Sequence, residues 1–273
     1  MHSNRSFLFL SRALSILALG GVLIWAVPAV VAHYQVQQAA DAQWADLHAR
    51  GAVRAAIDPG WQPFSFFSDQ GWQGLDADLT YELVRRIGLS VQLDPVGYDA
   101  LYDALHLKRD DIAVSAVVID PSRAETIAYT EAYFDAGVHL VVFNRVDIRH
   151  PQDLEGKRVA VALGADGDRV ARYWERRLAH LTRLTMNDEA TALAAAQSGL
   201  ADAALVDALA ALRYTPHVTG KLPVLISVEP RLYAIAVRRD NTHLLSALNA
   251  ALAELRADGT LQHLIRRWIV VNP

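Results

Sequence analysis

The sequence predicts an α/β protein with two lobes, and three observations support this prediction. Segments typical of buried strands alternate with segments typical of helices along most of the chain, which is the pattern of sheets covered by helices. The alternation occurs twice, and the polar, proline-containing stretch 144–151 separates the two runs. A strand and two helices follow the second run, and we expect them to return and pack on the first lobe.

The first run begins with Ala52–Ile57, a short apolar strand that ends in an Asp-Pro-Gly turn. Asp76–Ile87 carries leucine and valine on one face, an acidic residue near its start and a glycine just past its end, so it is predicted to be a helix. Val91–Val96 and Tyr98–Leu107 are predicted to form the second strand and the second helix.

Ile112–Arg123 closes the first run and is the stretch that we expect to carry function. Its first seven residues are mostly β-branched or small and do not alternate with polar residues, which is typical of a strand buried on both faces. Asp120 and Pro121 end this strand, and Arg123 then falls in the first turn of a helix. Open α/β sheets bind ligands beyond the carboxyl ends of their strands. Arg123 is therefore either a ligand-binding residue or an exposed residue at a helix start.

The second run follows the same pattern after residue 157. Its predicted strands are Arg158–Leu163, Leu181–Thr185 and Ala203–Val206, and its predicted helices are Asp168–Leu178 and Asp188–Ser198. The returning elements are the strand Leu232–Val237 and the helices Asn241–Ala257 and Leu261–Trp268. Two such runs imply two sheets.

Composition excludes several classes of function. The chain has 273 residues, of which 52% are apolar and 21% are charged, so it is long enough for two globular lobes. Without residues 1–32 it keeps 24 basic and 30 acidic side chains, a net charge of −6 that argues against a nucleic-acid partner. It contains no cysteine, which excludes disulfides, thiolate metal sites and a cysteine nucleophile.

The N-terminal segment predicts export. Ala13–Ala32 is an uncharged run preceded by Arg5 and Arg12, which is the layout of either a signal peptide cut after Ala32 or a single membrane anchor. Either alternative places the rest of the chain at the periplasmic or extracellular face of the cytoplasmic membrane. Residues 33–48 are expected to form a stalk or a first helix. We then expect residues 49–136 with 232–273 to form lobe 1 and residues 137–231 to form lobe 2.

Several residues that suit a small zwitterion fall at predicted strand ends or in the turns beyond them. They are Asp58, Trp61, Tyr98, Arg123 and Asp207. A guanidinium binds a carboxylate, an aspartate accepts an ammonium group, and aromatic rings stack on a side chain. Each residue also has a structural alternative, because aspartates cap helices and turns and aromatics pack at the rim of a core.

The same stretches resemble the periplasmic amino-acid-binding proteins of ABC importers, solute-binding protein family 3. The resemblance runs from about Ala49 to Ile269 and rests on eight motifs in order. They are Ile57–Phe67, Gly74–Leu83, Val96–Leu105, Val114–Ala124, Tyr129–Gly137, Leu154–Gly164, Ser198–Asp207 and Leu248–Trp268.

The resemblance implies a type II periplasmic-binding-protein fold, in which two mixed sheets with flanking helices are joined by two hinge crossings. These crossings would lie near Asp135–Val138 and Glu229–Tyr233. It also implies a role for each candidate: Arg123 is similar to the carboxylate-binding arginine, Asp207 to the ammonium acceptor, Trp61 and Tyr98 to the stacking aromatics, and Asp58 to a contact for basic side chains. The full set of expected ligand-binding residues is Asp58, Trp61, Tyr98, Ser115, Asp120, Arg123, Gly164, Ala165, Asp166 and Asp207.

The chain departs from the family pattern at three places. Asp120 stands where a hydroxyl is usual, Val118 replaces a serine or threonine, and Gly164-Ala165-Asp166 replaces Gly-Ser/Thr-Thr. Lost donors weaken carboxylate binding by about 1–3 kcal/mol each, and inward-pointing aspartates would add repulsion. Backbone N–H groups of the loop 164–167 remain available in principle to bind an anion.

These departures leave three hypotheses. The first is an importer component that binds a polar or cationic amino acid, with ABC permease subunits as partners. The second is a cyclohexadienyl dehydratase-like enzyme on the same scaffold, with Asp120 or Asp166 as general acid. The third is a membrane-tethered sensor or a degenerate binding protein.

Other kinds of chemistry have little support in the sequence. The chain lacks the common phosphate-loop, nucleophile-elbow and dinucleotide motifs, and its ten histidines show no metal-ligand spacing. We therefore expect no cofactor, no metal and no enzymatic activity. We expect a monomer that contacts the membrane through the N-terminal segment if that segment is retained.

Overall fold

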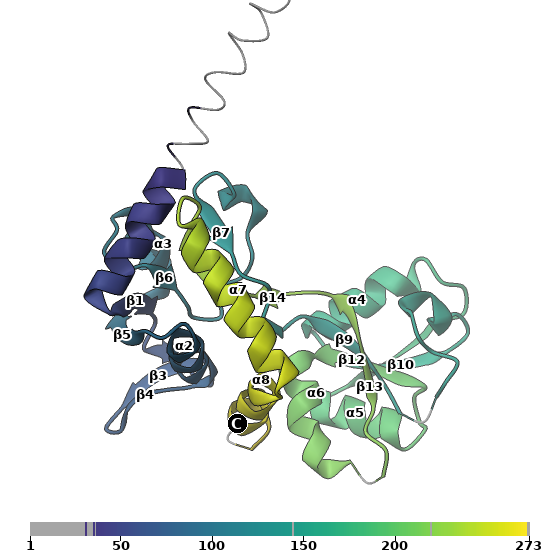
Figure 1. Cartoon of the computed structure of the whole chain (residues 1–273). Coiled ribbons are helices and arrows are strands. Elements are labelled where there is room, and N and C mark those ends of the chain that lie inside the picture. Colours follow the sequence, from purple (N-terminus) through teal and green to yellow (C-terminus); the bar gives the residue numbers. More distant parts are fainter. Residues whose placement is uncertain (1–30, 32–34, 36, 144, 219, 272–273) are drawn as a thin grey trace, which may run out of the picture.

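A computed structural model describes residues 31, 35, 37–143, 145–218 and 220–271. It shows two α/β lobes connected by two extended segments (Figure 1). We call residues 37–136 and 232–271 lobe 1, and residues 137–231 lobe 2. Each lobe has its own five-stranded mixed sheet, so the predicted fold class is confirmed.

The sheet of lobe 1 contains strands from both ends of the chain. Its order is β5 (Ser90–Pro95), β1 (Ala52–Ile57), β6 (Ile112–Ala113), β15 (Ala236–Arg238) and β7 (Ile127–Tyr129). β1 is parallel to β5 and β6, whereas β15 is antiparallel to β6 and β7. The late strand therefore returns to lobe 1, as the sequence predicts.

Helices and a small sheet complete lobe 1. The helices are α2 (Leu75–Arg86), η1 (Tyr98–Ala100), α3 (Leu101–His106), η2 (Pro121–Arg123), α7 (Thr242–Ala257), α8 (Thr260–Ile265) and η5 (Arg266–Val271). The small sheet consists of β2 (Gly60–Trp61), β3 (Ser65–Ser68) and β4 (Gly71–Gln73). The leucines of α7 that the sequence places inward, Leu244, Leu248, Leu252 and Leu255, are all buried in the core of lobe 1.

The strand predicted over Ile112–Val118 is wrong beyond Ala113. The chain leaves the sheet there because Ser115 turns its hydroxyl to the backbone N–H of Asp58, at 2.7 Å, and Ala116 has a left-handed φ of 47°. Val118 then forms an isolated antiparallel bridge with Tyr233. The buried character of this stretch comes from the turn and its surroundings, not from a long strand.

Residues 37–50 form a helix that packs against the rest of lobe 1, drawn in purple in Figure 1. Leu47 is 1% exposed and belongs to the core. His243 of α7 lies 2.6 Å from Asp41, and Arg50 pairs with Asp111 at 2.8 Å. The segment that we expected as a stalk or first helix is thus helical over these residues.

The expected signal peptide or anchor at residues 1–32 lies outside the described residues, apart from Val31. In the part of the chain that is described, no helix combines the length and the apolar character needed to cross a bilayer.

Lobe 2 has a second mixed sheet with helices on both faces. The strand order is β11 (Thr182–Met186), β10 (Arg158–Ala162), β12 (Ala203–Asp207), β9 (Val138–Val142) and β13 (Val224–Glu229). The helices are η3 (Pro151–Leu154), α4 (Asp166–Glu175), α5 (Glu189–Gln197), α6 (Ala208–Tyr214) and η4 (Thr215–His217). Alternate strand residues belong to two separate apolar clusters, one that includes residues of α4 and one that includes residues of α5 and α6. α4 therefore packs on one face of the sheet, and α5 and α6 pack on the other.

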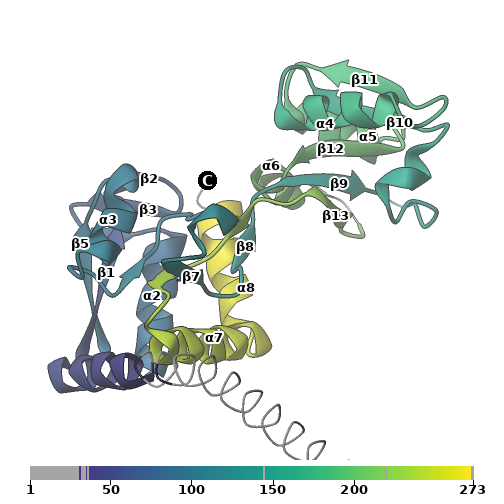
Figure 2. The ribbon, with the colours of Figure 1, turned by 90° about the horizontal axis from the view of Figure 1, so that it is seen from above.

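Two strands cross between the lobes (Figure 2). β8 (Phe134–Asp135) continues through Gly137 into β9, and β13 continues through Pro230 into β14 (Leu232–Tyr233). β8 pairs with β14, and β9 pairs with β13, both antiparallel.

The carboxylate of Asp135 ties the two crossing strands together. It accepts hydrogen bonds from the N–H of Gly137 and of Arg231, both at 2.9 Å, and from the hydroxyl of Ser227 at 2.6 Å. Partial burial tends to raise the pKa of Asp135, but these hydrogen bonds outweigh burial and hold the pKa below its usual value. The hinge therefore contains an ionised, fully engaged carboxylate at neutral pH.

Gly137 is the position in this crossing that tolerates no side chain. A Cβ there would lie 2.0 Å from the carbonyl oxygen of Glu229 and 2.6 Å from the nitrogen of Arg231. We expect Gly137→Ala to lower the free energy of unfolding by about 1–3 kcal/mol, because the two strands must separate to admit the methyl group. Urea unfolding measures this change.

Gly97→Ala is the matched control, since a Cβ there meets nothing within 4 Å and the residue has a φ of −60°. If both variants unfolded at the same urea concentration as the unmodified chain, the hinge would not be as tightly packed as described.

Candidate ligand-binding site

The turn after β1 forms the base of the candidate site on lobe 1. The two carboxylate oxygens of Asp58 accept hydrogen bonds from the N–H of Gly60 and of Tyr98, each at 2.7 Å. The N–H of Asp58 donates to the hydroxyl of Ser115, which also lies 2.9 Å from the hydroxyl of Ser65. Asp58 therefore joins the ends of β1 and β5 to the turn after β6.

Two aromatic rings stand exposed above this base. Trp61 and Tyr98 are stacked, with ring centroids 6.2 Å apart and planes inclined by 29°. They are 50% and 40% exposed, which is high for large aromatic side chains. This pair provides an apolar surface on which a ligand side chain can lie.

Arg123 lies in the same lobe, at the end of η2. Its guanidinium carbon is 4.0 Å from the centroid of the Tyr102 ring, and its Nε is 3.3 Å from Asp120 Oδ2. Asp120 also accepts hydrogen bonds from the hydroxyl and the N–H of Ser122, and these bonds lower the pKa of Asp120. Asp120 is thus an ionised turn cap that positions Arg123.

The loop before α4 contributes the first part of lobe 2. Gly164 has a φ of 80°, and its N–H donates to Asp168 Oδ2 at 3.0 Å. The N–H of Ala165 donates to the carbonyl of Ala162 at 3.2 Å. These two N–H groups are therefore already occupied within the loop.

Asp166 is held by two arginines. Its carboxylate lies 3.1 Å from Arg231 of the hinge and 3.4 Å from Arg169 of α4. Arg169 in turn pairs with Glu229, at 2.5 Å. These ion pairs connect the start of α4 to the second hinge crossing and neutralise Asp166.

Asp207 caps α6 at the end of β12, and Glu189 lies beside it. Asp207 Oδ1 accepts the N–H of Ala210 at 2.7 Å, and the N–H of Asp207 donates to Glu189 Oε1 at 3.2 Å. Burial raises the pKa of Glu189, and the negative charge of Asp207 raises it further. Among the described residues, neither carboxylate has a basic nitrogen within salt-bridge distance.

Glu189 was absent from the sequence prediction. It directly follows Asp188, the N-cap of α5, beyond the carboxyl end of β11. The rule that identified Asp207, a polar residue just past a parallel strand, applies equally to Glu189.

The structure groups the predicted residues into two half-sites. Asp58, Ser115, Trp61 and Tyr98 are linked by direct contacts in lobe 1, and a narrow cavity at the hinge is lined in part by Asp166 and Asp207. Within the described chain, no hydrogen bond or ion pair joins Arg123 to Asp207, and the contacts of Arg123 all lie in lobe 1.

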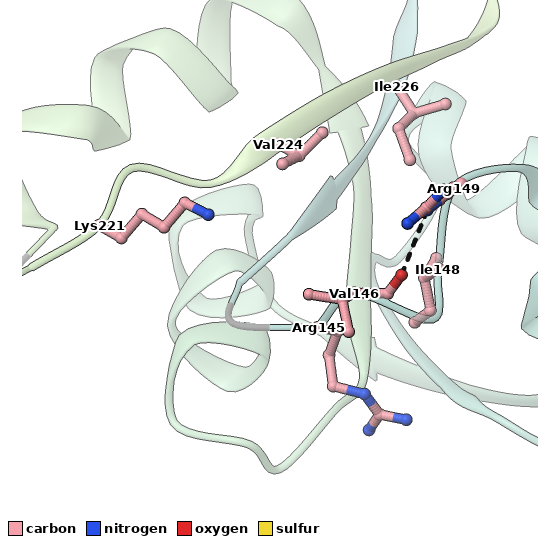
Figure 3. Close-up of a pocket in the computed structure, with 7 residues that line it drawn as sticks. All are labelled: Arg145, Val146, Ile148, Arg149, Lys221, Val224 and Ile226. Atoms are coloured by element: carbon pink, nitrogen blue, oxygen red, sulfur yellow. Dashed lines mark hydrogen bonds between the residues drawn. The ribbon is translucent and has the colours of Figure 1, made fainter.

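A separate cavity of about 280 Å³ lies on lobe 2, beyond the end of β9 that points away from the hinge (Figure 3). Its lining residues are Arg145, Val146, Ile148, Arg149, Lys221, Val224 and Ile226. It includes none of the predicted ligand-binding residues.

A buried carboxyl group supports the lobe 1 half-site from below. Asp76 of α2 is 0% exposed and accepts hydrogen bonds from the hydroxyl of Tyr133 and the N–H of Ala116, both at 2.6 Å. Burial raises the pKa of Asp76 to about 7, although these two hydrogen bonds oppose the shift.

Comparison with known proteins agrees with this architecture. Residues 53–271 match the family model of bacterial extracellular solute-binding proteins, family 3. The chain belongs to this family.

Its relatives include amino-acid-binding proteins. The solute-binding protein is 30% identical to the L-cystine-binding protein TcyJ of Escherichia coli K12 over 223 residues, which is 80% of this chain and 83% of TcyJ. It is 30% identical to the histidine-binding periplasmic protein of the same strain over 227 residues, covering 79% and 86% of the two chains. An ancestral cationic amino acid solute-binding protein, AncCDT-1, superposes with a TM-score of 0.52 at 27% identity, covering 82% of this chain and 98% of that one.

The raised pKa of Asp76 predicts how the stability of the solute-binding protein depends on pH. Between about pH 4 and pH 7 the folded state keeps a proton on Asp76 that the unfolded chain has lost. The contribution of this residue to stability is therefore full at low pH and falls as the pH rises through this range, by up to about 1.4 kcal/mol per pH unit.

Asp76→Asn removes the titration while keeping an acceptor for Ala116. We expect the unfolding free energy of this variant, relative to the unmodified protein, to increase from pH 4 to pH 7 and then level off. Urea unfolding at several pH values measures the difference. A difference that stays constant over this range would mean that Asp76 does not titrate there.

Proposed function

We propose that this protein is the extracytoplasmic substrate-binding component of an ABC importer and that it binds a cationic or polar amino acid between its lobes. The observation that carries the proposal is the separation of charge between the two lobes. Glu189 and Asp207 stand without a basic partner in the described part of lobe 2, and Arg123 stands on lobe 1. A zwitterion that bridges the lobes satisfies both.

Arg123 is suited to the ligand carboxylate. Its contact with Asp120 uses Nε, and its terminal nitrogens make no hydrogen bond with any described residue. Those nitrogens can therefore bind a carboxylate in addition to Asp120. Tyr102 supports the guanidinium plane from one side, which limits its freedom before ligand arrives.

Asp207 is suited to the ligand ammonium group. Among the described residues, a hydrogen bond reaches Oδ1 of Asp207 as a helix cap and none reaches Oδ2, so Oδ2 can accept a hydrogen bond from the ligand. Glu189 adds a second carboxyl group next to it, which favours a ligand with additional positive charge. The stacked Trp61 and Tyr98 provide the surface for the aliphatic or aromatic part of the ligand.

The relatives support the same class of ligand. TcyJ is described as binding L-cystine and the periplasmic relative as binding histidine, and the ancestral protein is described as a cationic amino acid solute-binding protein. All three descriptions concern amino acids.

The dehydratase alternative is less favoured. A general acid must hold a proton at the working pH. The hydrogen bonds from Ser122 lower the pKa of Asp120, and the carboxylate of Asp166 is paired with Arg231 and Arg169. Asp120 therefore lacks the surroundings of a general acid, and the carboxylate of Asp166 is occupied by its two arginine partners.

Titration calorimetry with L-arginine, L-lysine, L-histidine, L-cystine and L-glutamine tests the proposal. We expect saturable binding of at least one cationic or polar member. We expect Arg123→Ala to weaken it by about 2–5 kcal/mol, because a desolvated carboxylate loses its charged partner. Arg149→Ala, which removes an exposed arginine from the cavity of Figure 3, is the control and leaves the affinity unchanged. Absence of binding across the panel would overturn the proposed function.

Glu189→Gln tests the preference for positive charge. The amide oxygen can still accept the N–H of Asp207, so the variant removes charge and keeps the hydrogen bond. We expect the affinity for L-lysine to fall at least fivefold, about 1 kcal/mol, while the affinity for L-glutamine changes little. Glu155→Gln, an exposed site elsewhere on lobe 2, is the control. Equal losses for both ligands would show that Glu189 does not set charge preference.

A further inference from the structure

Asp76 occupies an unusual position for an acidic residue. It lies in the first turn of α2, it is fully buried, and it touches no basic side chain within salt-bridge distance in the described chain. Each of its two oxygens accepts one short hydrogen bond, from Tyr133 and from Ala116. Burying a carboxyl group costs free energy, and these two hydrogen bonds offset part of that cost.

The bond to Ala116 fixes the turn that follows β6. Ala116 has a φ of 47°, a conformation that alanine adopts rarely and at a cost of about 1–3 kcal/mol. Its N–H points to Asp76 Oδ2 at 2.6 Å, so the carboxyl group stabilises the turn in this form. Without an acceptor at this place, the buried N–H would lack a partner and the turn would lose its main restraint.

The same turn arranges the residues of the lobe 1 half-site. On one side of Ala116, the hydroxyl of Ser115 accepts a hydrogen bond from the N–H of Asp58. The carboxylate of Asp58 in turn accepts one from the N–H of Tyr98. On the other side, Val118 is 38% exposed and bridges to Tyr233 in the hinge. A change at Ala116 therefore displaces both ends of this network.

The bond to Tyr133 extends the network to the hinge. Tyr133 directly precedes β8, the strand that leaves lobe 1, and its own N–H donates to the carbonyl of Tyr233 in β14 at 2.9 Å. One buried carboxyl group thus contacts both the turn of the half-site and the segment where the first crossing begins.

We propose that Asp76 is a positioning residue for ligand binding. It fixes the conformation of the turn at Ala116 and connects this turn to the hinge through Tyr133. This inference rests on the proposed function, because it assigns to Asp76 a role in the affinity of the same site. Asp76 does not touch the ligand and acts through Ser115, Asp58 and the start of β8.

The test compares three variants by calorimetry with L-arginine and L-cystine. Asp76→Ala removes both hydrogen bonds, and we expect it to weaken binding at least tenfold. Asp76→Asn offers one acceptor to Ala116 and one donor to Tyr133, and we expect it to restore affinity to within about threefold of the unmodified protein. Thr80→Val is the matched control, since Thr80 is buried in the same helix and its hydroxyl donates to the backbone carbonyl of Asp76, at 2.7 Å, and not to the carboxyl group.

A purely structural role predicts a different result. In that case Asp76→Ala and Thr80→Val would lower the melting temperature while the folded fraction of each bound with unchanged affinity, and this outcome would overturn the inference. Tyr133→Phe covers the case in which Asp76→Ala does not fold. It keeps the bond between Asp76 and Ala116 and removes the hydrogen bond from the Tyr133 hydroxyl to Asp76, and we expect a several-fold weaker affinity. Unchanged affinity in Tyr133→Phe would also overturn the coupling.

Failure of the inference differs from failure of the proposed function. If the unmodified protein binds one of the two amino acids and the Asp76 variants bind it equally well, only the role of Asp76 is wrong. If the unmodified protein binds neither, the variants are compared with the member of the five-amino-acid panel that does bind, and if no member binds, both proposals fall.

Discussion

The arrangement of the whole molecule depends on the carboxylate of Asp135, which holds the two crossing strands together. It receives hydrogen bonds from Gly137 on one strand and from Arg231 and Ser227 on the other. The close approach of the two crossing strands requires glycine at position 137, because the backbone of Glu229 occupies the space where a Cβ would be. The lobes also touch where Ala208, Leu209 and Leu212 of α6 pack on the apolar core of lobe 1. Closure would therefore rotate the lobes about the two crossings and this contact.

The hinge also explains how charge is distributed near the candidate site. Arg231 and Arg169 neutralise Asp166 and Glu229 close to the crossing. Glu189 follows β11 and Asp207 ends β12, two strands that flank β10 in the sheet of lobe 2, and in the described chain they keep no basic partner. Arg123, on lobe 1, keeps its terminal nitrogens free of described hydrogen bonds. A ligand with opposite charges at its two ends therefore gains more from contact with both lobes than with either one, which is the condition for closure driven by ligand.

Much of this was predictable from the sequence, for physical reasons that particular residues illustrate. The leucines of α7 repeat at helical spacing, and α2 has acidic residues at its start and basic residues at its end, so both helices follow from local chemistry. Asp58 and Asp207 follow from their places just past apolar strands. The Asp-Pro step before Arg123 predicts the chain reversal that η2 shows.

Other features depend on contacts between distant parts of the chain. The expected long strand at Ile112–Val118 ends after Ala113 because Asp76 and Asp58, far away in sequence, bind the turn at Ser115 and Ala116. Arg231, which neutralises Asp166, lies sixty-five positions later in the sequence, so no local sequence pattern predicts this ion pair. Glu189 is different, since it satisfies the same strand-end rule as Asp207 and was missed because it directly follows a helix cap.

The central claim is that the lobes close around an amino acid. Small-angle X-ray scattering of the protein, with and without the amino acid that calorimetry identifies, tests this claim most directly. Closure predicts that the radius of gyration decreases saturably, at the concentrations at which heat of binding is released. A radius of gyration that does not change at saturating ligand would contradict the account, because a molecule that binds without drawing the lobes together does not bridge Arg123 and Asp207.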